Sequence, residues 1–296
     1  MRMSAYIQTT SPHIFHPDSV SKRNWKQSAA LLPIVLAVLF VSKWNGFQVI
    51  LAAISGGMIG QWLFAKVSKA KMHFDGQSLL FPLLFSLMLP FGAPYPIAFA
   101  GGFISTVIGK EFFGGAGAYP FHPSMLALLI VQLSFPAMLS GAHGWTHEMA
   151  LPDLAWGYAG GRLITSASAA LSVSVLLLLW MRVIAWDASV VFLVTLVLFA
   201  YLLGEAILPL LAMDGVLFAA FFLITETVST PTTRRGHRLF ACLAAVTYVL
   251  FRVTAAHPTN LPCSILLANS LTPLLDHWIR PRLSYPKQEN RTRPKS

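Results

Sequence analysis

The stretch from Gly109 to Gly141 places two charged residues and a glycine cluster between two strongly apolar segments. Lys110 and Glu111 come first, and three glycines follow, at Gly114, Gly115 and Gly117. Lipid tolerates irregular backbone only where protein buries it or where it lines a polar cavity, and glycine reaches positive φ without steric cost. One interpretation is a binding loop with Glu111 in a polar mouth. The other is a connecting turn, in which Lys110 is solvated and Glu111 pairs with a basic neighbour.

A second polar stretch, Thr225–Gly236, follows an apolar segment and combines hydroxyl side chains with one carboxylate and two adjacent arginines. Its candidate site residues are Thr225, Glu226 and Thr230. Hydroxyl groups and an arginine pair suit a phosphate or an anionic head group. The same residues also suit helix capping and the excess of basic residues in cytoplasmic loops. The sequence leaves both interpretations open.

Metal-ligand patterns are weak in this chain. His143 and His147 have the spacing of two ligands on one helix face, but the glycines beside them argue against a helix there. Cys242 and Cys263 have no partner at zinc or iron–sulfur spacing. There is also no phosphate-binding P-loop, dinucleotide fingerprint or nucleophile elbow. We therefore predict neither a metal site nor a catalytic side chain.

The composition indicates a membrane protein. The chain has 296 residues, of which 55% are hydrophobic and 11% are charged, and its mean hydropathy is +0.64. A soluble domain carries roughly 25% charged residues, so this chain lacks the charge to cover a water-facing surface. Its formal net charge of +10 comes from short loops and tails rather than from one exposed face. That distribution is typical of membrane topology and argues against a nucleic-acid partner.

We expect a transmembrane domain at residues 29–279, made of segments that span or half-span a bilayer. Several are shorter than the roughly 20 residues of a full span, and prolines interrupt two of them, with Pro82 expected to break one. Ten segments divide five and five, so the halves would have opposite orientation, as in an inverted repeat. The prediction is an all-α polytopic fold. The segments are 29–42, 47–65, 79–91, 95–109, 123–140, 163–184, 188–208, 212–227, 238–256 and 261–276.

The tails and the basic residues predict the orientation. Residues 1–28 are expected to be a flexible cytoplasmic tail, and residues 280–296 a basic, disordered one. With the N-terminus in the cytoplasm, the loops on the other side hold little beyond Lys43 and Arg162. Both termini are therefore predicted to be cytoplasmic. Arg252 lies inside a predicted span, so it should face protein or water.

Three blocks in this order resemble one family of membrane redox subunits. That family comprises the NqrB subunit of the sodium-pumping NADH:quinone reductase and the RnfD subunit of the Rnf complex, and the resemblance covers roughly residues 70 to 280. It implies a ten-helix inverted-repeat fold similar to urea transporters, in the bacterial inner membrane. It also implies electron transfer through bound flavins, beside other subunits of a redox complex. The blocks are Gly109–Gly117 with Pro123 and Pro136–Gly141, then Thr225–Gly236, then Leu266–Asp276.

The chain departs from the family pattern at the flavin sites. The family attaches FMN to the threonine of a Ser-Gly-Ala-Thr motif, whereas this chain has Ser-Gly-Ala-His143, and Thr146 is the remaining hydroxyl in the core of that loop. The family's riboflavin lies near the Gly-rich loop, where two expected asparagines are replaced by Tyr119 and His122. The family's aspartate in the second block is Glu226. We expect bound FMN or riboflavin to be non-covalent. Tyr119 and His122 either contact an isoalloxazine ring or pack the turn.

Two functional hypotheses follow. The first is a membrane subunit of a flavin-linked electron transport complex, with ion translocation as a coupled process and a quinone as a further candidate partner. The alternative is a channel or transporter for a small solute on the same scaffold, without redox chemistry. The missing attachment threonine favours the alternative, and the retained polar blocks favour the first hypothesis. Whether the chain is itself an enzyme stays open.

Overall fold

The computed structural model describes residues 20–69, 75–90, 92–139, 162–184, 186–212, 215–254 and 258–279. Within these ranges the chain forms helices and turns and no strand, with one isolated bridge between Pro90 and Arg162. The all-α class predicted from the sequence is confirmed for this part of the chain.

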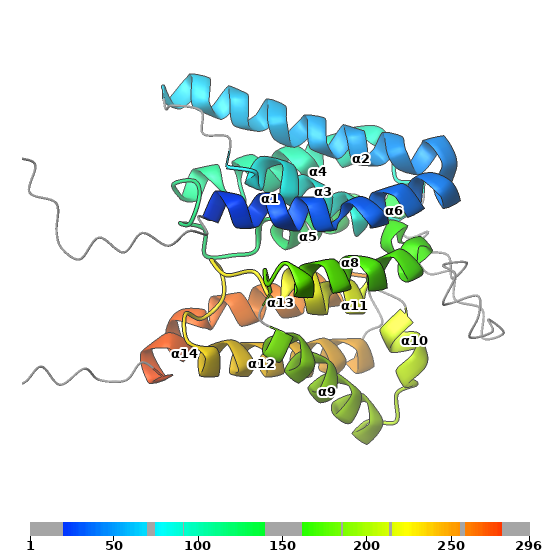
Figure 1. The fold of residues 1–296 in the computed structure, drawn as a ribbon, viewed down its shortest axis with the longest axis vertical. Helices are drawn as coiled ribbons and strands as arrows, with labels where there is room; N and C mark the ends of the chain where they lie inside the picture. The colour runs from blue at the N-terminus through cyan, green and yellow to red at the C-terminus, as the bar shows by residue number, and fades with distance from the viewer. Residues whose placement is uncertain are drawn as a thin grey trace, which may run out of the picture.

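The first part of the chain folds back and forth along one direction (Figure 1). Its ribbon runs along α1 and the start of α2, reverses, and returns along the rest of α2, so that two candidate spans, Val20–Ser42 and Trp44–Ser68, lie on either side of the reversal. A Cβ at Gly46 would lie 2.5 Å from the Cβ of Ser42, so the reversal requires glycine there. The helices are α1 (Val20–Ala30), α2 (Leu32–Ser68), α3 (Gln77–Leu87), α4 (Tyr95–Val107), η1 (Glu111–Phe113), α5 (Pro123–Ser134) and α6 (Pro136–Leu139).

The second part packs beside the first and runs along the same direction, with α9 splayed outward (Figure 1). It contains η3 (Leu163–Ala167), α8 (Ser168–Trp180), α9 (Trp186–Leu202), α10 (Ile207–Ala212), α11 (Val216–Phe218), the π-helical turn η4 (Ala219–Leu223), α12 (Arg234–Thr254), α13 (Asn260–Ser270) and α14 (Thr272–Ile279).

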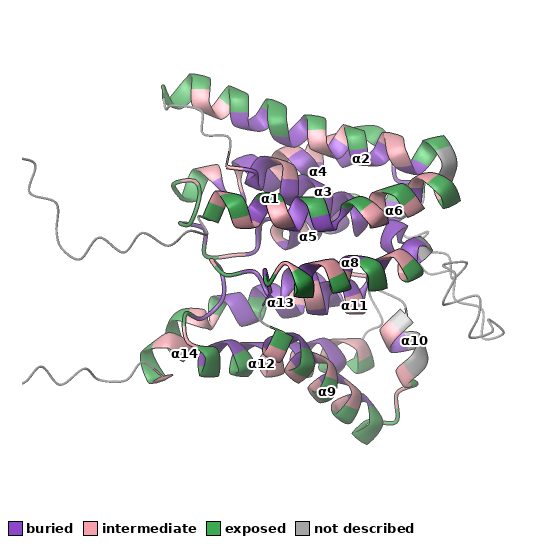
Figure 2. Ribbon diagram, viewed as in Figure 1, coloured by how far each residue is buried: buried purple, intermediate pink, exposed green. Residues whose placement is uncertain are grey.

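The described residues have the surface of a membrane protein. Three helical segments are long and apolar enough to cross a bilayer, namely Val20–Ser42, Trp44–Ser68 and Arg234–Thr254. Figure 2 shows exposed residues along the outer faces of α2, α8, α9 and α12. Large apolar side chains are among them, such as Phe40 at 87% and Trp180 at 79% exposure. Water-soluble proteins rarely expose such surface. The count of ten spans and the inverted repeat stay predictions.

Two local expectations were wrong. Helix α1 begins at Val20, inside the segment assigned to a flexible tail, because its buried face packs on the bundle through Asn24, Gln27 and Ala30. Helix α3 continues through Pro82 instead of breaking there. The proline ring fills a slot beside Gly57, where a Cβ would lie 2.2 Å from its Cγ. Tertiary packing thus compensates for the missing backbone N–H.

Helices α2 and α4 approach each other closely because small residues line their contact. A Cβ at Gly102 would lie 1.9 Å from the carbonyl oxygen of Ala53, and one at Gly56 would lie 2.1 Å from that of Phe99. Glycines let helix backbones meet in this way in membrane bundles. The contact fixes α4, whose final turn leads into the Gly-rich loop.

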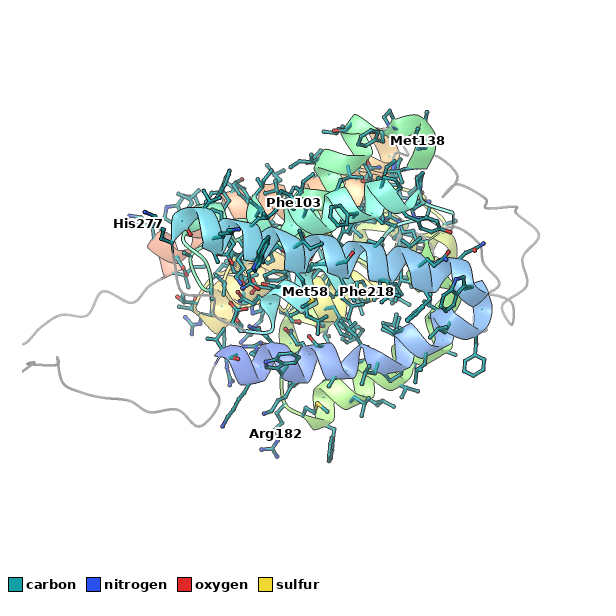
Figure 3. All side chains as sticks on the ribbon, turned by 90° about the horizontal axis from the view of Figure 1, so that it is seen from above. Met58, Phe103, Met138, Arg182, Phe218 and His277 are labelled. Carbon is teal, nitrogen blue, oxygen red and sulfur yellow. The ribbon has the colours of Figure 1, made fainter. Side chains whose placement is uncertain are left out.

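The two polar stretches meet at one end of the bundle. Helix α1 begins there and α14 finishes there, and we call this the tail end (Figure 1). The η1 loop and the connection from η4 to α12 lie at the same end. In Figure 3, His277 marks the tail end and Met138 the opposite one. The fold therefore brings together blocks that are far apart in the sequence.

Candidate functional site

The Gly-rich turn has the backbone that its sequence predicts. Gly114, Gly115 and Gly117 have φ values of 107°, 88° and 90°, which side chains other than glycine rarely adopt. The turn carries the chain from η1 back toward the bundle and delivers Tyr119 into its interior.

Lys110 is buried, with 1% of its side chain exposed, so the expectation of a solvated lysine was wrong. Its Nζ lies 2.8 Å from Asp75 Oδ2 and 3.2 Å from Glu111 Oε1, and it donates a 3.3 Å hydrogen bond to Ser78 Oγ. The start of α3 supplies Asp75 and Ser78, which no local pattern could place beside α4. The predicted pairing of Glu111 is found, and Lys110 is its partner.

Glu226 is the centre of a buried hydrogen-bond network. Its Oε2 accepts bonds from Val228 N at 2.9 Å, from Ser229 N at 2.8 Å and from Ser229 Oγ at 2.9 Å. Its Oε1 accepts a 3.0 Å bond from the hydroxyl of Tyr119. These donors stabilise a carboxylate that is only 9% exposed. The network joins the Gly-rich turn to the second polar stretch.

Tyr119 is held from three sides. Its hydroxyl donates to Glu226 and accepts a 3.1 Å bond from Gln77 Nε2, and its ring meets Phe81 edge-on at 5.4 Å between centroids. Burial, and then the nearby charge of Glu226, raise the pKa of Tyr119 far above its usual range. The hydroxyl therefore stays protonated and keeps its role as a donor.

His122 is fully buried before α5, with its ring 5.9 Å from that of Phe81. Neither ring nitrogen has a hydrogen-bond partner among the described residues. Burial lowers the pKa of His122 from 6.5 to about 4, although the charge of Glu226 acts in the opposite direction. The neutral imidazole is therefore the form that this position accommodates.

Acidification is expected to destabilise the fold through His122. Between pH 6.5 and pH 4 the unfolded chain binds a proton at this histidine and the folded chain does not, so the contribution is full above pH 6.5 and is lost toward pH 4. The loss is about 3 kcal/mol at the lower limit. His122→Phe should flatten the pH dependence of the unfolding temperature in detergent, whereas His277→Gln, at an exposed position, should not. Parallel pH profiles for parent and His122→Phe would contradict this.

A cavity of about 960 Å³ opens at the tail end between the three polar blocks. We call it the tail-end cavity. The Gly-rich turn, the second polar stretch, and the junction of α13 and α14 each form part of its wall. The lining residues are Gly117, Ala118, Tyr119, Pro120, Val228, Ser229, Asn269, Thr272, Pro273, Asp276, His277 and Trp278.

The predicted site residues divide into two groups. Gly117 and Tyr119 line the cavity. Several others lie around it, in the turn or in the buried network, without lining it, and Thr146 lies outside the described residues. The residues that do not line the cavity are Glu111, Gly114, Gly115, His122, Thr225, Glu226 and Thr230.

The hydroxyls of the second stretch cap backbone carbonyls. Thr225 Oγ1 donates a 2.6 Å bond to Phe221 O, and Thr230 Oγ1 donates to the backbone oxygen of Glu226. Arg234 and Arg235 are exposed and do not line the cavity. Of the two interpretations left open by the sequence, these contacts favour helix capping over a phosphate site.

The wall formed by α13 and α14 was missing from the predicted site. The resemblance of Leu266–Asp276 to a family block was the available signal, and it was used for the family alone. Asn269 and Thr272 flank the helix break at Leu271, and the hydroxyl of Thr272 donates a 3.1 Å bond to Ser229 O. Asp276 Oδ1 accepts a bond of 3.1 Å from Thr232 N. These contacts dock the last helix on the second polar stretch.

Comparison with known proteins agrees with the three-block pattern. The model of the NQR2, RnfD, RnfE family matches residues 7–284. One component of an ion-translocating oxidoreductase complex from Halorhodospira halophila, the subunit designated D, is 29% identical, over 71% of this chain and 75% of that protein. The subunit of the same name from Methanosarcina acetivorans is 26% identical, over 93% and 95%.

A third relative, also the subunit designated D, belongs to a proton-translocating ferredoxin:NAD(+) oxidoreductase complex from Clostridium ljungdahlii. It is 25% identical, over 95% of this chain and 96% of its own length. The family model covers nearly the whole chain, including all three blocks that form the tail-end cavity. This chain belongs to the NQR2, RnfD, RnfE family.

Proposed function

We propose that this chain is the membrane subunit of an ion-translocating, flavin-linked electron transport complex, and that its tail-end cavity holds FMN or riboflavin non-covalently. One observation carries the proposal: the three polar blocks, distant in sequence, converge on a single hollow. The names of the relatives support the assignment to a redox complex, with its other subunits as partners.

The cavity has the size and chemistry for a flavin. Ligand sites commonly have volumes of roughly 300–1,000 Å³ with a few fixed polar groups, and this one holds about 960 Å³. Tyr119 and Trp278 offer aromatic faces, and Ser229 and Thr272 are fixed by hydrogen bonds. Its lining contains Asp276 and no lysine or arginine, which favours a neutral ring system over a phosphate group. A bound flavin would supply reversible one- and two-electron chemistry.

The basic residues support a cytoplasmic tail end in the bacterial inner membrane. Lys22, Lys66 and Lys69 lie at this end, as do Arg182 and Arg234. Positive charge gathers on the cytoplasmic side of membrane proteins. Both termini would then be cytoplasmic, and the flavin would lie on the side from which a soluble reductant delivers electrons. Ten spans in an inverted repeat fit the family, and the exposed apolar faces would contact lipid and neighbouring subunits.

The purified full chain is expected to carry flavin that acid precipitation releases. Absorption and fluorescence spectra of the supernatant and pellet measure this directly. Ala118→Trp fills the cavity from an exposed position of the turn and should lower the retained flavin about tenfold or more. Ala116→Trp is the matched control, because Ala116 is exposed in the same turn but does not line the cavity.

Other outcomes would change the proposal. Flavin retained in the acid pellet and lost in Thr146→Ala would reveal a covalent link at that threonine. Absence of flavin from both the purified chain and its complex, together with solute flux through liposomes containing the chain, would support the small-solute channel instead.

A further inference from the structure

We propose that Asn269 reads the ligand of the tail-end cavity through a paired donor and acceptor edge, and so selects an imide-bearing ring over a quinone. The inference rests on the proposed function, since it names the group by which a flavin would be recognised. A quinone was the competing planar ligand for a redox subunit.

Asn269 is an uncompensated polar side chain in the cavity wall. It is 2% exposed and lines the cavity at the end of α13. Neither its Nδ2 nor its Oδ1 has a hydrogen-bond partner among the described residues. A buried carboxamide can donate two bonds and accept two, and leaving them unmade is unfavourable. An apolar residue would serve better here if the position only filled space.

The neighbouring polar groups do not use this amide. The hydroxyl of Tyr119 donates to Glu226, that of Ser229 donates to the same carboxylate, and that of Thr272 donates to Ser229 O. These donors face the protein and hold the wall in place. Asn269 stands among them with both kinds of hydrogen-bonding capacity left over.

The capacity of Asn269 matches one class of ligand. The pyrimidine edge of an isoalloxazine presents carbonyl oxygens beside the N3–H group, so a carboxamide can donate to one and accept from the other. A quinone presents carbonyl oxygens alone, so Oδ1 would stay unpaired and buried. The amide atoms are covered in this structure, so rotation of the Asn269 side chain completes the contact.

The first test changes the ligand and leaves the protein intact. Riboflavin, 3-methylriboflavin and a short-chain quinone are titrated into the full chain in detergent, with flavin fluorescence or competition as the readout. Methylation removes the N3–H donor, so its binding should be about 10- to 100-fold weaker than that of riboflavin. The quinone should compete weakly. Equal affinity for the two flavins would overturn the inference while leaving flavin binding, and hence the proposed function, intact.

The second test changes the residue. Asn269→Leu should lower riboflavin affinity about 10- to 100-fold and bring the ratio between riboflavin and 3-methylriboflavin close to one. Gln132→Leu is the matched control, because Gln132 is 4% exposed, has an unpartnered Oε1, and does not line the cavity. Asn269→Leu that binds like the parent, or a parent that binds the quinone and no flavin, would overturn the inference; the second result would also remove the proposed flavin.

Discussion

Glu226→Ala is expected to destabilise the folded chain by about 3 kcal/mol or more. The substitution removes the acceptor of four hydrogen bonds, three of them from the backbone and hydroxyl of Val228 and Ser229 and one from Tyr119. Each buried donor left without a partner adds its own desolvation penalty. The connection between the Gly-rich turn and the second polar stretch is lost at the same time, so the tail-end cavity should lose its shape.

The unfolding of this variant can be followed with a thiol-reactive dye. Cys242 and Cys263 are free and half-buried, so they gain reactivity as the chain opens. Asp187→Ala is the matched control, since Asp187 pairs with Arg238 at 3.3 Å while both side chains are substantially exposed. Such a pair contributes about 1 kcal/mol or less. A Glu226→Ala chain that unfolds at the temperature of the parent would show that the network is dispensable.

Gly102→Ala is expected to be the most damaging single-methyl change in the helix contacts, at about 3 kcal/mol or more. Its Cβ would lie 1.9 Å from the backbone oxygen of Ala53, so no rotamer change relieves the overlap and α2 and α4 must separate. In an exposed helix the same change is favourable by about 1 kcal/mol, which makes the sign of the result diagnostic. Gly102→Leu should yield no monodisperse protein in detergent.

Gly117→Ala separates helix overlap from backbone strain. Nothing lies within 4 Å of its added Cβ, but its φ is +90°, so only strain of about 1–3 kcal/mol is expected. Thermal unfolding of the two variants in the same detergent compares the effects. If Gly102→Ala were as stable as the parent, the close approach of α2 and α4 would not be required for folding.

Local rules predicted the turn of the candidate site well and its partners poorly. Glycine at Gly114, Gly115 and Gly117 predicted positive φ because the preference belongs to each residue alone. The environment of Lys110 was wrong, because Asp75 and Ser78 reach it from another helix. Arg252 has the protein partner expected of a charge within a span, with Glu205 Oε2 at 3.7 Å.

Composition, apolar segments and three polar blocks determined by themselves that this is a helical membrane protein of one redox family. These properties are additive along the chain, so no contact map is needed to read them. Only the tertiary structure decided which polar residues share a hollow, placing Asn269 and Thr272 opposite Tyr119 and leaving His122 behind the wall. The reason is physical: a cavity is bounded by residues that helix packing brings together, and packing depends on close contacts such as that of Gly102 with Ala53.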